Sequence, residues 1–102
     1  MSIEDVQLKG SWYEVYGERS KKLKSLPSSS VGELCGFSNE IIVFHKGSWF
    51  EIYDEEGKKL KSLPASSVGD FRNVSGRNIL FKKGSWIETY DVTGKKINSR
   101  PA

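Results

Sequence analysis

The chain repeats itself every 37 residues. The tetrapeptide Lys-Gly-Ser-Trp occurs three times, and its tryptophans, Trp12, Trp49 and Trp86, follow one another at that spacing without a gap. A fixed period of this length is typical of proteins that stack copies of one supersecondary unit. The 102 residues fall nine short of three complete units. We therefore predict a single repeat domain, 1–102, made of units 4–40, 41–77 and 78–102, the last being one strand short.

Each unit is predicted to form short strands separated by turns. The middle unit has segments rich in β-branched and aromatic residues, interrupted by Gly47-Ser48, by Glu55-Glu56-Gly57 and by Pro64. These residue types favour strands and turns respectively. The expected strands span 40–46, 49–54, 58–63 and 68–74, and no window has a helical apolar period. Counted over the chain, the pattern predicts an all-β fold of about eleven strands, grouped four, four and three.

Short turns between consecutive strands require antiparallel meanders. Three such sheets suit the blades of a β-propeller as the first choice and a β-prism as the second. A tryptophan, then Asp-x-x-Gly-Lys, then a Gly-Asp-Phe strand occur as Trp49, Asp54, Gly57, Lys58, Gly69, Asp70 and Phe71, and the last unit has Trp86, Asp91, Gly94 and Lys95. In these residues the chain resembles the bacterial WG-type β repeats and the outer hairpins of propeller blades. That resemblance implies all-β repeats.

The strand that begins at each tryptophan carries the same three residues on one face in every unit. Side chains alternate along a strand, so residues two apart lie on one face. We call these three faces the Trp-Glu-Tyr faces; their residues are Trp12, Glu14, Tyr16, Trp49, Glu51, Tyr53, Trp86, Glu88 and Tyr90. An aromatic plane beside a carboxylate could stack on a sugar ring and accept its hydroxyl protons. The alternative is structural: Trp and Tyr pack between sheets, while Glu accepts a hydrogen bond from one of them or pairs with a lysine.

Lysine pairs recur on the third strand of each unit. They are candidate anion-binding residues, and the set is Lys21, Lys22, Lys58, Lys59, Lys95 and Lys96. Around a common axis they would form a positive belt suited to an anionic partner. The alternative is that lysines on an outermost strand prevent edge-to-edge aggregation.

Nothing in the sequence indicates catalysis. Cys35 and the single histidine, His45, belong to no repeated pattern, and no phosphate-binding glycine motif or nucleophile elbow occurs. One glutamate per unit offers no facing pair for glycoside hydrolysis. We therefore predict that the protein is not an enzyme and uses no metal and no cofactor.

Charge and composition limit the partners and the cellular compartment that we expect. The net charge of +3 makes nucleic acid an improbable partner, and a single cysteine excludes a disulfide framework. There is no signal peptide and no apolar run long enough to span a membrane, so we expect a cytoplasmic protein.

Three blades close a ring poorly, so a homo-oligomer is expected, most simply a dimer that completes a six-unit ring. We predict a non-catalytic interaction or assembly module. The alternatives are a lectin-like carbohydrate-binding protein that uses the Trp-Glu-Tyr faces, and a binder of anionic partners.

Overall fold

The computed structural model describes residues 2–101 and is built from three antiparallel sheets. The described residues form eleven strands, as the sequence predicts. The bounds are β1 (Asp5–Lys9), β2 (Trp12–Tyr16), β3 (Lys22–Pro27), β4 (Glu33–Phe37), β5 (Ile41–Lys46), β6 (Trp49–Asp54), β7 (Lys59–Pro64), β8 (Asp70–Ser75), β9 (Asn78–Lys83), β10 (Trp86–Tyr90) and β11 (Lys96–Pro101). Two one-turn helices, α1 (Ser28–Val31) and α2 (Ala65–Val68), and a 3₁₀ turn, η1 (Glu18–Ser20), complete the chain.

The grouping of the strands differs from the prediction. The sheets are β1-β2-β3, β4-β5-β6-β7 and β8-β9-β10-β11, so the short sheet is the first and not the last. The strand expected to close each unit instead opens the next sheet. Its partner is set by the turn that follows: Gly76-Arg77 joins β8 to β9, and a two-residue connection makes those strands pair. The predicted unit boundaries at 40/41 and 77/78 therefore do not coincide with the boundaries of the sheets.

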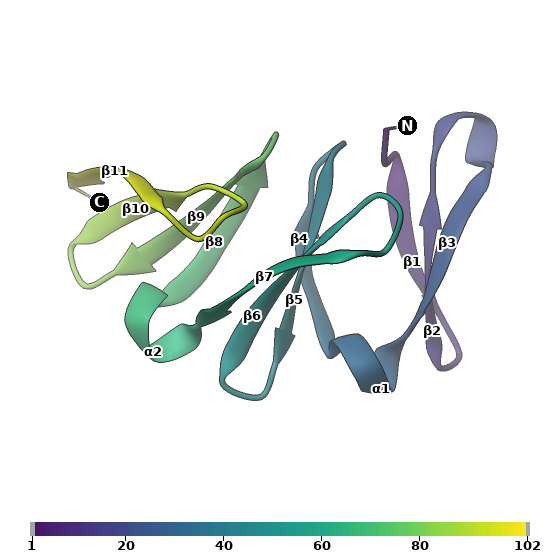
Figure 1. Cartoon of the computed structure of the whole chain (residues 1–102), viewed down its shortest axis with the longest axis horizontal. Helices are drawn as coiled ribbons and strands as arrows, with labels where there is room; N and C mark the ends of the chain where they lie inside the picture. The colour runs from purple at the N-terminus through teal and green to yellow at the C-terminus, as the bar shows by residue number, and fades with distance from the viewer. Residues whose placement is uncertain (1, 102) are drawn as a thin grey trace.

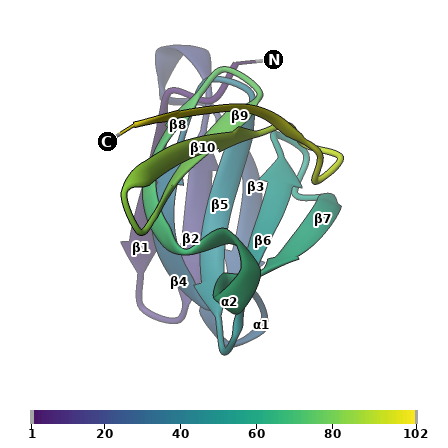
Figure 2. The same ribbon diagram turned by 90° about the vertical axis from the view of Figure 1, so that its left-hand side faces the viewer.

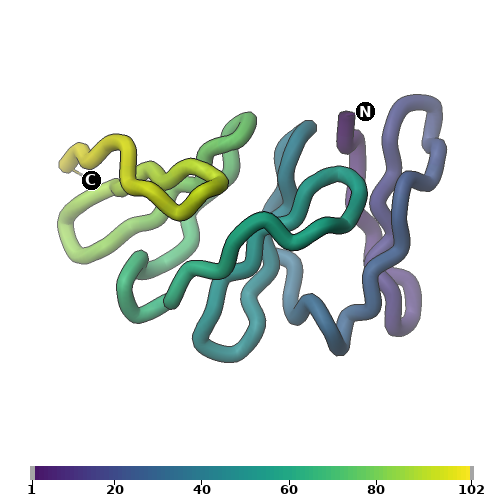
Figure 3. The backbone as a smooth tube through the Cα atoms, in the orientation of Figure 1, coloured from purple at the N-terminus to yellow at the C-terminus, as the bar shows by residue number. Residues whose placement is uncertain are grey.

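The described part of the molecule extends 39 × 26 × 20 Å along its three principal axes. The three sheets lie in a row along the longest of these axes (Figure 1). The chain passes from one sheet to the next through α1 and α2, both on the same side (Figure 3). Figure 2 looks along the row and shows the third sheet in front, with β10 and β11 crossing over the strands behind. Among the described residues no helix is long and apolar enough to cross a membrane.

Two hydrophobic cores separate the sheets. The first contains Val15 and Phe44 and lies between the first and second sheets; the second contains Ile52 and Phe81 and lies between the second and third. The middle sheet is thus covered on both faces. This explains why the four consecutive residues Ile41–Phe44 of β5 are all fully buried, whereas a half-exposed strand would alternate.

The two outward faces of the row are more polar than the inward ones. Asp5 and Gln7 occupy the positions on β1 that Ile42 and Phe44 occupy on β5, 37 residues later. At the other end, Thr89 and Arg100 stand where the middle sheet has buried Ile52 and Leu63. A polar outer face on a terminal unit is the usual way in which a stack of repeats ends in water.

Candidate functional site

Each tryptophan begins its strand directly after a two-residue turn. The glycines of these turns, Gly10, Gly47 and Gly84, have φ near +60°, which a glycine adopts without strain. Cross-strand pairing then places a lysine opposite each tryptophan on one neighbouring strand and a proline opposite it on the other. These neighbours are Lys9 and Pro27 for Trp12, Lys46 and Pro64 for Trp49, and Lys83 and Pro101 for Trp86.

The tryptophans are not buried between sheets. Their exposed fractions are 48% for Trp12, 46% for Trp49 and 50% for Trp86, among the largest of any apolar residue described. The structural alternative therefore does not hold for this member of the Trp-Glu-Tyr faces. Sequence reasoning identified the tryptophans but missed the Lys and Pro neighbours, whose signal was the constant spacing of Lys and Pro from each Trp.

The glutamates lie deeper and are held by a tyrosine and a lysine. The Tyr16 hydroxyl donates to Glu14 Oε1 at 2.6 Å, and the equivalent bonds, Tyr53 to Glu51 and Tyr90 to Glu88, measure 3.4 Å. The lysine Nζ atoms approach the same carboxylates: Lys22–Glu14 at 3.9 Å, Lys59–Glu51 at 3.8 Å and Lys96–Glu88 at 3.4 Å. For Glu and Tyr, the sequence-based structural alternative describes the contacts well.

The tyrosines of the second and third sheets are partly buried against phenylalanines. Tyr53 meets Phe44 edge-on at 5.5 Å between ring centroids, and Tyr90 meets Phe81 in the same way at 5.7 Å. Burial, followed by the neighbouring carboxylates of Glu51 and Glu88, raises the pKa of both phenols. In the first sheet, hydrogen bonding to Tyr16 lowers the pKa of Glu14.

These pKa shifts predict late ionisation of two tyrosines. The neutral phenols are favoured in the fold, so their contribution to stability is complete below the ordinary pKa of 10.0 and declines as pH rises through the folded value. The measurement is a pH titration of phenolate absorbance in the wild type and in Tyr53→Phe or Tyr90→Phe. The difference between the wild-type and variant curves reports the missing tyrosine, and its midpoint should lie above the pKa of a free tyrosine. A midpoint at or below the ordinary value would contradict the packing described for that ring.

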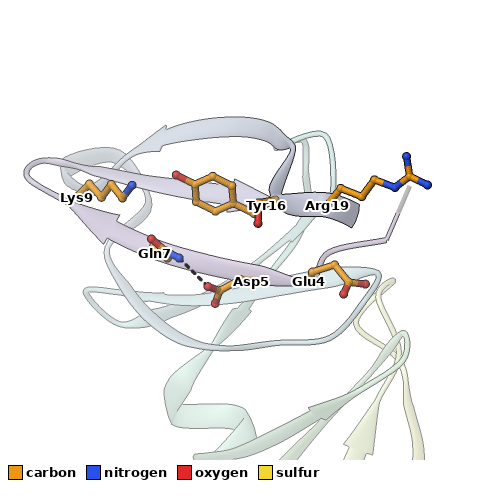
Figure 4. A pocket seen from close by; sticks show the side chains of 8 residues that line it. Glu4, Asp5, Gln7, Lys9, Tyr16 and Arg19 are labelled. Carbon is orange, nitrogen blue, oxygen red and sulfur yellow. Dashed lines mark hydrogen bonds between the residues drawn. The ribbon is translucent and has the colours of Figure 1, made fainter.

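The first sheet differs from the others because no sheet formed by residues 2–101 covers its Trp-Glu-Tyr face. An open depression of about 460 Å³ lies there, shown in Figure 4, and its lining includes Asp5, Gln7, Lys9, Tyr16 and Arg19. Gln7 donates from Nε2 to Asp5 Oδ2 at 2.9 Å. The three faces are therefore not equivalent sites, contrary to what their identical sequences suggested. The signal was present in the sequence as Asp5 and Gln7 in place of isoleucine and phenylalanine.

The predicted lysine belt is divided between two environments. Lys22, Lys59 and Lys96 face the glutamates just described, which offset part of their charge. Their partners in each pair, Lys21, Lys58 and Lys95, are exposed beside them. The strands concerned, β3, β7 and β11, lie at the edges of their sheets, where lysine discourages aggregation.

His45 and Cys35, the two residues outside the repeated pattern, pack within the fold. His45 stacks on Phe50 with 4.7 Å between ring centroids. Burial raises the pKa of the half-buried Cys35 thiol, which disfavours the reactive thiolate. Comparison of the chain with protein-family models, with curated proteins and with solved structures found no match.

Proposed function

We propose that this chain is a non-catalytic β-repeat interaction module whose principal contact residues are Trp12, Trp49 and Trp86. The observation that carries the proposal is that each ring is about half exposed in the same setting, between a lysine and a proline. Large aromatic residues that remain accessible on a rigid strand are the residue type that dominates the binding energy of protein interfaces.

The arrangement favours binding because the tryptophans are already held in place before a partner binds. Each tryptophan is fixed to a paired strand, and the Glu-Tyr-Lys contacts below it stiffen the same face. Binding would therefore cost these residues less conformational freedom than it would cost residues on a flexible loop.

We further propose a propeller-like relation between the sheets. It is supported by the approach of β4 to β8, the first strands of adjacent four-stranded sheets. Closure of a ring by a second copy remains a prediction. The polar residues Asp5 and Gln7 on the outer face of the first sheet weigh against face-to-face closure there.

Replacing a single tryptophan, for example in Trp49→Ala, should weaken partner binding at least about tenfold, as expected for an interface hot spot. Because about half of the ring is already exposed, the free energy of unfolding should fall by only about 1 kcal/mol. The measurement is quantitative affinity capture from extract of the source cells, followed by titration of the purified partner by calorimetry.

Ile97→Ala is the matched control, because Ile97 is 49% exposed but lies outside the Trp-Lys-Pro settings. It should leave binding unchanged. Equal losses for Trp49→Ala and Ile97→Ala, or unfolding of Trp49→Ala, would show that the tryptophan serves packing and not recognition.

A carbohydrate ligand is the second candidate, and the depression on the first sheet favours it. Asp5 and Gln7 line the depression and have oxygens that can accept hydroxyl protons, and Trp12 offers a half-exposed plane on the same face of the sheet. This candidate expects one site per chain, sensitive to Trp12→Ala and insensitive to Trp86→Ala. A glycan array probed with the wild type and both variants distinguishes it from the protein-binding proposal.

A further inference from the structure

The first sheet has an open edge that is filled in the other two. Among residues 2–101, β1 pairs with β2 alone, whereas the equivalent strands β5 and β9 pair on their other side with β4 and β8. The same chain therefore shows twice how a strand occupies this position. The opposite edges of the three sheets, at β3, β7 and β11, carry the lysine pairs described above, and the other edges of the second and third sheets are β4 and β8 themselves.

Main-chain N–H groups of β1 point toward this open edge. The Val6 N–H donates to Oδ1 of its neighbour Asp5 at 2.9 Å instead of to β2. Because N–H directions alternate along a strand, the N–H of Leu8 points to the same side as that of Val6. In the other sheets the residues equivalent to Asp5 are Ile42 and Ile79, which cannot cap this N–H, and a neighbouring strand is present there instead.

The side chains beside the edge are incompletely covered. Leu8 is 58% exposed, more than any other large apolar residue described. Leu34 and Phe37 of β4 are only half-buried where they pack against the core between the first two sheets. A strand paired with β1 would cover both regions, as β8 covers β4 at the next interface.

We propose that the β1 edge binds an extended segment of a separate protein as a fourth strand. The segment pairs antiparallel with residues 5–8, in the register that β4 uses on β5. Main-chain hydrogen bonds then provide affinity, and alternate side chains provide specificity, as in other cases of strand addition. The surface is distinct from the tryptophans, so the inference goes beyond the proposed function.

The neighbouring residues define the chemistry of the segment. Opposite Val6 a small or medium-sized residue fits, because the equivalent residues of β4 and β8 are Gly36 and Asn73. Opposite Asp5, on the outward face, the register places the counterpart of Phe37. Asp5 favours a lysine or arginine there through an exposed ion pair across the strands.

The probe is a synthetic peptide with the sequence of residues 30–38, carrying Cys35→Ser and Phe37→Lys. Titrated into the intact ¹⁵N-labelled chain, it should shift the amide resonances of Val6 and Leu8 first. A second peptide with Phe37→Glu should bind about two- to fivefold more weakly, and Asp5→Lys in the protein should reverse that preference. Equal affinity of both peptides for both proteins would overturn the assigned register.

Leu8→Pro tests the backbone pairing directly. Proline removes the N–H that faces the open edge but none that pairs with β2, so the fold should persist while peptide binding is lost. Leu8→Ala keeps the N–H and should retain binding. If Leu8→Pro does not fold, the charge exchange at Asp5 still decides the proposal. Unaltered binding by Leu8→Pro, or concentration-dependent shifts at β1 without peptide, would overturn it, the latter by assigning the edge to a second copy.

Discussion

Gly69→Ala should cost about 3 kcal/mol or more of unfolding free energy, a large part of the stability of a domain of this size. Gly69 follows α2 and has φ of +91°, a conformation that strains any L-residue with a side chain. A Cβ would also lie 2.6 Å from the Lys82 carbonyl oxygen and 3.1 Å from Lys83 Cα. Both obstacles are backbone atoms, so relief requires β9 to move. Urea denaturation followed by circular dichroism measures the loss.

Gly84→Ala provides the control for this prediction. Gly84 also has positive φ, +61°, but no atom of residues 2–101 lies within 4 Å of its hypothetical Cβ. Alanine there should cost about 1 kcal/mol, the ordinary penalty of left-handed backbone. The difference between the two variants isolates the clash with β9. Similar losses for both would mean that the passage from α2 into β8 is less tightly packed than the structure describes.

Phe44→Gln should cost about 4 kcal/mol or more. Phe44 is fully buried and packs against Tyr13 at 5.1 Å and Tyr53 at 5.5 Å between ring centroids. The substitution removes aromatic packing and places an amide in an apolar core, and each change is destabilising by itself. The variant should lose its cooperative thermal transition or show a strongly reduced Tm by calorimetry.

Gln7→Phe is the reciprocal control, because Gln7 occupies the same position in the first unit. Its side chain lies on the uncovered face, so phenylalanine should change the free energy of unfolding by no more than about 0.5 kcal/mol. The added apolar surface should instead promote self-association, which analytical ultracentrifugation detects. If Phe44→Gln were tolerated as well as Gln7→Phe, the first two sheets would not be packed as described.

The contrast between these positions also bears on how the stack ends. A valine precedes both residues and Lys-Gly-Ser-Trp follows both after one intervening residue, yet Phe44 is in a core and Gln7 is in water. Asp5 and Gln7 make the outer face of the first sheet polar, and Asp5 also caps the Val6 N–H at the open edge. The first unit is therefore specialised at the residues that would otherwise contact a preceding sheet.

The number and approximate position of the strands could be predicted from the sequence alone. Turn residues such as Gly47 and Gly57, and the β-branched and aromatic runs between them, act locally and therefore fix where each strand begins and ends. The Trp-Glu-Tyr alternation likewise followed from the two-residue period of a strand. The tryptophans were accordingly identified as candidate contact residues before any tertiary arrangement was considered.

Only the tertiary structure decided which sheet a strand joins and which face stays in water. The segment after Pro64 could pair backward with β7 or forward with β9; α2 leads the chain away from β7, and the Gly76-Arg77 turn then pairs the segment with β9. Trp49 and Tyr53 lie on one face, but a neighbouring sheet covers the tyrosine end and leaves the tryptophan exposed. The open edge of β1 arises for the same reason, because pairing and burial depend on residues far away in the chain, whereas turns and strands depend on neighbours.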